Sequence, residues 1–193
     1  MDRSIQIDKK RTALVVIDLQ KGITSMPTKP YEAGSVIANA ARLAAAFREN
    51  DMPVFLVRVK SSADAKDRLD PVADMKMRMS LPAPADWSDI VPELGPEPSD
   101  FIITKKQWGA FYGTELDLQL RRRKMETIVL CGIATSIGVE STARFAYEYG
   151  YQQIFAEDAM TSRAEEEHAN SVKNIFPRIG RVRKTGEILA AIA

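Results

Sequence analysis

The chain has only one cysteine and one histidine among its 193 residues. A single cysteine excludes an internal disulfide. Together the two counts exclude zinc fingers, nearly all metal centres built from histidine or cysteine, and catalysis by a cysteine–histidine–asparagine set. We therefore expect neither a metal ion nor a cofactor.

An excess of charge of one sign and long apolar runs are also lacking. The 27 basic and 26 acidic side chains leave a net charge of +1, which gives no electrostatic reason to expect nucleic acid or a membrane surface as a partner. Apolar runs such as Ala13–Ile17 are far shorter than the roughly 20 residues of a membrane span. The segment Met1–Lys10 lacks the apolar region of a signal peptide. We expect a cytoplasmic protein with a single domain over residues 1–193.

Short apolar runs alternate with helical patterns along the chain. The runs predict buried strands at Ala13–Ile17, Pro53–Val59, Phe101–Thr104, Thr127–Gly132, Gln153–Glu157 and Arg181–Arg183. Helical spacing is found at Gly34–Asn50, Thr114–Arg123, Val139–Tyr149, Ala164–Phe176 and Thr185–Ile192. This alternation predicts an α/β fold with three layers, in which helices cover both faces of a parallel sheet. The polar, proline-rich segment Lys60–Pro98 is predicted to be an irregular insertion, which in a compact domain is usually functional or mobile.

Polar residues follow several of the predicted strands. Asp18 and Gln20 follow the first, Lys105 follows the third, and Gly132–Gly138 follows the fourth. Ligands of open parallel sheets bind beyond the carboxyl ends of the strands, so these residues are candidates for one site. Burial after an apolar strand raises the pKa of an aspartate such as Asp18 unless a cation lies nearby, and Lys105 could be that cation. A helix cap or turn explains Asp18 equally well, and a solvated strand end explains Lys105.

The lone cysteine and the lone histidine both favour structural interpretations. Cys131 lies inside an apolar run, where a free cysteine behaves as a small hydrophobic residue. A nucleophilic thiol needs partial exposure and a lowered pKa. His168 follows three glutamates and is expected to be a surface or helix-packing residue.

Four segments in this order resemble the motifs of the isochorismatase-like (cysteine hydrolase) superfamily. They are Thr12–Gln20, Ile103–Leu116, Val129–Ala143 and Glu157–Ala159. The resemblance extends from about residue 10 to the C-terminus. It implies a Rossmann-like sandwich with a six-stranded parallel sheet and assembly as a homodimer or homotetramer.

The resemblance also implies a site built from an aspartate, a lysine and a cysteine. The aspartate corresponds to Asp18, and the lysine to Lys105, which lies six positions before Phe111. A cis peptide is implied between Ile133 and Ala134, where it helps to form an oxyanion site. The position of the nucleophilic cysteine is occupied by Gly138 in this chain.

The glycine at position 138 implies catalysis without a covalent intermediate, as isochorismatases perform it on a vinyl ether. There the aspartate acts as a general acid, and water then adds to the oxocarbenium ion. The chain departs from isochorismatases at Val59, where they carry glutamine, and it has no recognisable Trp-Gly-Pro-Gly stretch in its insertion. It therefore resembles a separate branch of the superfamily.

The sequence thus predicts a hydrolase that acts on a small, anionic substrate. We expect Asp18 as the general acid or base and Lys105 as its electrostatic partner. The further candidates are Gln20, which would orient Asp18 or a water molecule, Trp108 and Phe111 as pocket walls, and the backbone around Ile133, Ala134 and Gly138. Two alternatives stay open: a binding protein that has lost the nucleophile, and an oligomeric scaffold.

Overall fold

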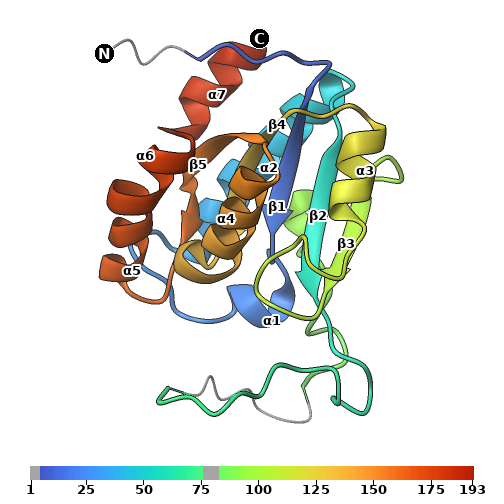
Figure 1. Ribbon diagram of the computed structural model, residues 1–193, viewed down its shortest axis with the longest axis vertical. Helices are drawn as coiled ribbons and strands as arrows, with labels where there is room; N and C mark the ends of the chain where they lie inside the picture. Colours follow the sequence, from blue (N-terminus) through green and yellow to red (C-terminus); the bar gives the residue numbers. More distant parts are fainter. Residues whose placement is uncertain (1–4, 76–82) are drawn as a thin grey trace.

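The computed structural model describes residues 5–75 and 83–193. Residues 1–4, which belong to the segment Met1–Lys10, and residues 76–82 of the predicted insertion lie outside the described residues. The strands are β1 Thr12–Ile17, β2 Val54–Val59, β3 Phe101–Lys105, β4 Thr127–Ile133, β5 Gln152–Thr161 and β6 Arg181–Arg183. Within the described chain these six strands form one parallel sheet in the order β3-β2-β1-β4-β5-β6 (Figure 1). The six-stranded parallel sheet expected from the sequence is confirmed.

Helices connect the strands. The α-helices are α1 Lys21–Thr24, α2 Ala33–Glu49, α3 Leu116–Arg122, α4 Glu140–Glu148, α5 Glu165–Asn170, α6 Phe176–Ile179 and α7 Thr185–Ile192. A short 3-10 helix, η1, covers Pro92–Leu94, and two π-helical turns, η2 and η3, cover Thr135–Val139 and Ser171–Ile175. None of the helices in the described residues is long and apolar enough to cross a membrane.

The predicted helix Ala164–Phe176 differs most from the structure. It is divided into α5 and α6 by the π-helical turn η3, and it continues to Ile179. Pro177 lies in the first turn of α6. Proline has no backbone N–H and clashes with the preceding turn, so a continuous helix cannot pass through this position undisturbed.

The alternation of side chains along β1 explains the three layers. Leu14 and Val16 belong to a buried cluster that includes the apolar sides of α2 and α7. Val15 and Ile17 belong to a second buried cluster with residues of α3, α4 and α6. Because successive side chains of a strand point to opposite faces, this central strand is covered by helices on both faces.

The direction of the chain reverses at the centre of the sheet. β1 pairs with β2 on one side and with β4 on the other, so the chain returns to the middle of the sheet after β3. At Gly132, with a φ of 122°, an added Cβ would lie 2.0 Å from the carbonyl oxygen of Ile17. Only glycine permits this close approach of β4 to β1. The carboxyl ends of β1 and β4 therefore form the topological switch point, where open α/β sheets bind ligands.

Candidate active site

Asp18 and Lys105 form a buried ion pair at this switch point. Lys105 Nζ lies 2.7 Å from Asp18 Oδ2, and the two residues are only 2% and 5% exposed. Lys105 Nζ also donates a hydrogen bond of 2.7 Å to the carbonyl oxygen of Trp108. Asp18 directly follows β1 with a φ of 53°, a conformation that is uncommon outside glycine. Strained conformations of this kind persist where the surrounding structure fixes them, and they cluster at functional sites.

The environment of Asp18 favours its neutral form at a higher pH than usual. Burial raises the pKa of Asp18 from 3.8 to about 6, and the nearby Lys105 ammonium opposes this increase only partly. Asp18 Oδ1 has no hydrogen-bond partner among the described residues. The carboxyl group can therefore bind and release a proton close to neutral pH, as a general acid or base requires.

Gly138 lies against this ion pair. A Cβ atom added at Gly138 would lie 3.0 Å from Asp18 Oδ2 and 3.5 Å from Lys105 Nζ. It would also lie 2.9 Å from a methyl group of Ile17. The absence of a side chain at this position leaves room for the Asp18 carboxylate.

A cavity of about 650 Å³ opens in front of the ion pair. Its lining includes Asp18, Lys105 and Gly138 together with apolar side chains, among them Trp87 and Trp108. This volume is within the range of small-molecule sites. The cavity can therefore hold a small ligand in contact with the Asp18 carboxyl group.

The cavity is also lined by further cations. Two of them are neutralised by ion pairs: Lys21 with Asp86 at 2.9 Å, and Lys106 with Asp67 at 2.7 Å. The other two, Arg68 and Arg163, have no carboxylate partner among the described residues, and Arg163 donates a hydrogen bond of 3.1 Å to the sulfur of Met26. These two guanidinium groups are available to an anionic ligand.

Comparisons with known proteins agree with this geometry. A family model described as the isochorismatase domain matches residues 12–187. The chain belongs to the isochorismatase family. The isochorismatase family protein YwoC of Bacillus subtilis is 49% identical over 100% of both chains. A solved structure of an isochorismatase family protein from Burkholderia thailandensis superposes with a TM-score of 0.91 at 42% identity, and the match covers 97% of each chain.

Several relatives have a named activity. The ureidoacrylate amidohydrolase RutB of Methylobacterium radiotolerans is 31% identical over 92% of this chain and 78% of its own. The isochorismatase family thus includes hydrolases. The cis peptide that the family resemblance implied between Ile133 and Ala134 is present in this chain.

Of the residues proposed from the sequence to bind substrate, three line the cavity: Trp108, Ile133 and Ala134. The side chains of Gln20 and Phe111 lie elsewhere and do not line it. The expectation that they touch the substrate therefore finds no support in the geometry of the cavity.

Gln20 connects segments of the chain. Its side-chain amide accepts a hydrogen bond from the backbone N–H of Val59 at 2.8 Å and donates to the carbonyl oxygens of Val59 and Trp87 at 3.0 and 3.3 Å. These side-chain hydrogen bonds all go to backbone groups, and none goes to Asp18. Gln20 joins the end of β2 and the inserted segment to the end of β1.

Phe111 is buried in the apolar core. Its ring packs against Tyr149 and Tyr151, with ring centroids 5.3 and 5.8 Å apart. An aromatic residue near Lys105 in sequence can face either the cavity or the core, and Phe111 faces the core.

Two other cavity residues, Trp87 and Arg163, were not among the candidates from the sequence. Trp87 comes from the insertion Lys60–Pro98 and covers Gly22 so closely that an added Cβ would lie 2.0 Å from its ring. Arg163 follows β5 by two positions, so the rule that ligands lie beyond strand ends could have found it. Described residues of the insertion, including Arg68, thus supply part of the cavity wall.

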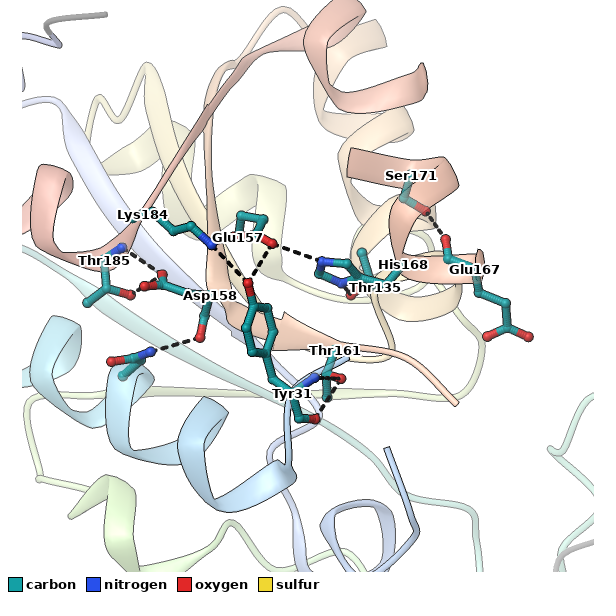
Figure 2. A network of polar contacts seen from close by, with 11 residues as sticks. Tyr31, Thr135, Glu157, Asp158, Thr161, Glu167, His168, Ser171, Lys184 and Thr185 are labelled. Carbon is teal, nitrogen blue, oxygen red and sulfur yellow. Dashed lines mark hydrogen bonds and ion pairs between the residues drawn. The ribbon is translucent and has the colours of Figure 1, made fainter. Parts of the chain in front are cut away.

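The two residues interpreted as structural are both buried. Cys131 lies inside β4, and burial raises the pKa of its thiol to about 12, so it is a core residue as expected. His168 is not a surface residue: it is 3% exposed, and both of its ring nitrogens make hydrogen bonds (Figure 2). Its partners, Thr135 and Glu157, are too far away in sequence for this network to be predicted.

Proposed function

We propose that this isochorismatase-family protein is a hydrolase of a small, anionic substrate and works without a covalent intermediate. The observation that carries the proposal is the buried Asp18 carboxyl group at the cavity, with its pKa raised to about 6. A carboxylic acid with a pKa near neutrality is suited to give a proton to a substrate and to take one back.

The absence of an accessible thiol supports the non-covalent route. Cys131 is the one cysteine of the chain, and it is fully buried in β4. A thiol nucleophile must be deprotonated and within reach of the substrate. At Gly138, which corresponds to the position of the family nucleophile, the Asp18–Lys105 pair occupies the adjoining space.

On an enol ether, the proposed reaction begins with transfer of the Asp18 proton to the carbon of the double bond. The resulting oxocarbenium ion is attacked by water, and the proton released from that water returns to the Asp18 carboxylate. The hemiketal then collapses to a ketone and an alcohol. Lys105 holds Oδ2 at 2.7 Å, which leaves Oδ1 to carry the proton.

The substrate class follows from the charges of the cavity. Arg68 and Arg163 face it without a carboxylate partner among the described residues. A carboxylate or phosphate on the substrate would pair with them, and the surrounding apolar side chains, including Trp87 and Trp108, would contact its uncharged part.

The test is turnover of a panel of enol ethers, amides and carbamates by the purified protein and by Asp18→Asn. The control is Asp51→Asn, because Asp51 has almost the same φ of 54° but is exposed at the end of α2. We expect turnover of at least one anionic compound by the native protein and by the control, with loss in Asp18→Asn. No turnover of any compound, or equal turnover by Asp18→Asn, would refute the proposal.

The glycine at position 138 also favours a second candidate, a binding protein that has lost the family nucleophile. This candidate predicts that an anionic compound raises the melting temperature without being consumed. Equal melting temperatures with every compound would leave the scaffold alternative, in which changes at Asp18 and Lys105 have no effect on ligand binding or turnover.

A further inference from the structure

A partly buried network of polar side chains has Glu157 of β5 at its centre (Figure 2). The Glu157 carboxylate accepts hydrogen bonds from the Tyr31 hydroxyl at 2.9 Å and from His168 Nε2 at 3.2 Å, and it is paired with Lys184. Burial raises the pKa of Glu157, but the hydrogen bonds from His168, Lys184 and Tyr31 outweigh burial and hold the pKa at about 2. Glu157 is therefore ionised at neutral pH and can only accept hydrogen bonds.

The charge on Glu157 determines how His168 is hydrogen-bonded. Since the carboxylate only accepts, His168 Nε2 must carry a hydrogen atom. In the neutral imidazole Nδ1 is then an acceptor, and it lies 2.9 Å from the hydroxyl oxygen of Thr135. The hydroxyl, the imidazole and the carboxylate thus form a chain of directed hydrogen bonds.

This chain has the order of groups that activates a nucleophile in some hydrolases. Here, however, Thr135 is fully buried and does not line the cavity, so a substrate cannot reach its hydroxyl group. The row of hydrogen bonds can therefore only hold Thr135 in place.

Thr135 is the first residue of η2. Ala134, directly before it, and Gly138, three positions after it, line the cavity. A second wall of the cavity is linked to the Glu157 carboxylate by hydrogen bonds. Thr28 lines the cavity and donates a hydrogen bond of 2.8 Å to the carbonyl oxygen of Tyr31, whose hydroxyl group binds Glu157. The Glu157 carboxylate is thus connected to two walls of the cavity.

Ser162 reinforces this arrangement. Its hydroxyl oxygen accepts a hydrogen bond from the N–H of Ser136 at 3.1 Å, and its backbone exchanges hydrogen bonds of 2.8 and 2.9 Å with Lys29. The turn after β4 and the segment that leads into α2 are therefore joined at two places.

We propose that Glu157 and His168 are positioning residues that hold the Thr135 turn against Asp18 and fix the distance between the two cavity walls. The inference rests on the proposed function only in taking Asp18 as the reacting acid. Because an added Cβ at Gly138 would lie 3.0 Å from Asp18 Oδ2, the turn helps to keep water away from the carboxyl group. Release of the turn exposes Asp18 to water.

Two matched pairs of variants test the proposal. Thr135→Ser keeps the hydroxyl group and Thr135→Val removes it at nearly the same volume. In His168→Asn the amide replaces the Nδ1 edge of the ring and can still bind Thr135, whereas in His168→Gln it replaces the Nε2 edge and binds only Glu157. The readout is the titration of the Asp18 carboxyl carbon by NMR, assigned by the loss of its signal in Asp18→Asn.

We expect Thr135→Val and His168→Gln to lower the pKa of Asp18 by at least about 0.5, because water then hydrates the carboxylate. Thr135→Ser is expected to leave it at about 6. His168→Asn keeps the contact with Thr135 but loses the one with Glu157, so it is expected to lower the pKa of Asp18 by less than His168→Gln does. Should both disruptive variants fail to fold, the same titration of Tyr31→Phe decides, with a lower pKa of Asp18 expected. An unchanged pKa in the folded disruptive variants, or equal shifts within each pair, overturns the proposal.

This readout is independent of hydrolysis. If the native protein turns over no compound but the titrations shift as expected, the positioning role stands and the proposed function fails. If Asp18→Asn loses turnover while the titrations do not move, the proposed function stands and the positioning role fails. The melting temperature of each variant shows whether a shift in the pKa of Asp18 reflects general loss of structure. Such a loss would lower the melting temperatures of both variants of a pair alike.

Discussion

The raised pKa of Asp18 adds a pH-dependent contribution to the stability of this protein. The substitution Asp18→Asn removes that contribution. In the folded protein this pKa is about 6, compared with a usual value of 3.8. Between these values the folded state holds the proton while the unfolded chain has released it. Stability is therefore highest below the lower pKa and decreases as the pH rises toward the upper one.

The size of the effect follows from the two pKa values. The full difference corresponds to about 3 kcal/mol, of which about 1.3 kcal/mol falls between about pH 5 and pH 7. Asparagine has no proton to release in this range. We therefore expect the difference in unfolding free energy, native protein minus Asp18→Asn, to decrease by about 1.3 kcal/mol over this interval.

The assay is urea unfolding, followed by circular dichroism, at several pH values across this interval. Any constant cost of removing the carboxylate from Lys105 appears at every pH and does not alter the slope. Asp51→Asn, the exposed aspartate with almost the same φ, is the control and should show the pH dependence of the native protein. A difference between native protein and Asp18→Asn that does not change with pH would show that burial does not dominate at Asp18, and the assignment of a general acid would lose its basis.

Three further predictions concern the walls of the cavity. Gly138→Cys is expected to lower the unfolding free energy by about 1–3 kcal/mol through crowding. Its thiol should be alkylated faster than free cysteine, since its Cβ would lie 3.5 Å from the Lys105 ammonium, and the buried native Cys131 gives no background. An alkylation rate equal to that of free cysteine would contradict the geometry. Arg163→Met should weaken binding of an anionic ligand about tenfold or more in calorimetry and leave the affinity for a neutral analogue unchanged. An equal loss of affinity for both ligands would argue against a charge contact. Gly22→Ala should displace Trp87, whose ring lies 2.0 Å from the added Cβ, and shift its fluorescence, whereas Gly34→Ala, with open space around it, should not.

The elements of the sheet could be predicted because their signals are local. The apolar run of β1 and the helical spacing of α7 are complete within a few residues, and their boundaries agree with the prediction to within one residue. The meeting of Asp18 with Lys105 could also be predicted, since parallel strands place their carboxyl ends at one edge of the sheet.

The directions of single side chains could not be predicted. Gln20 binds Val59, which is 39 residues away, and Phe111 turns into the core rather than toward Lys105. Trp87 reaches the cavity because of the path taken by the insertion, and no periodic pattern encodes that path. Such contacts depend on packing between segments that are distant in the sequence.

The burial of Cys131 has a consequence for the conditions under which the site can work. Hydrolases that use a thiolate are inactivated when peroxide converts it to a sulfenic or sulfonic acid. In this protein the one thiol is sealed inside β4, and its pKa of about 12 keeps it protonated. The carboxyl and ammonium groups at the cavity have no redox chemistry of their own, so the proposed catalytic pair is independent of the oxidation state of the surroundings.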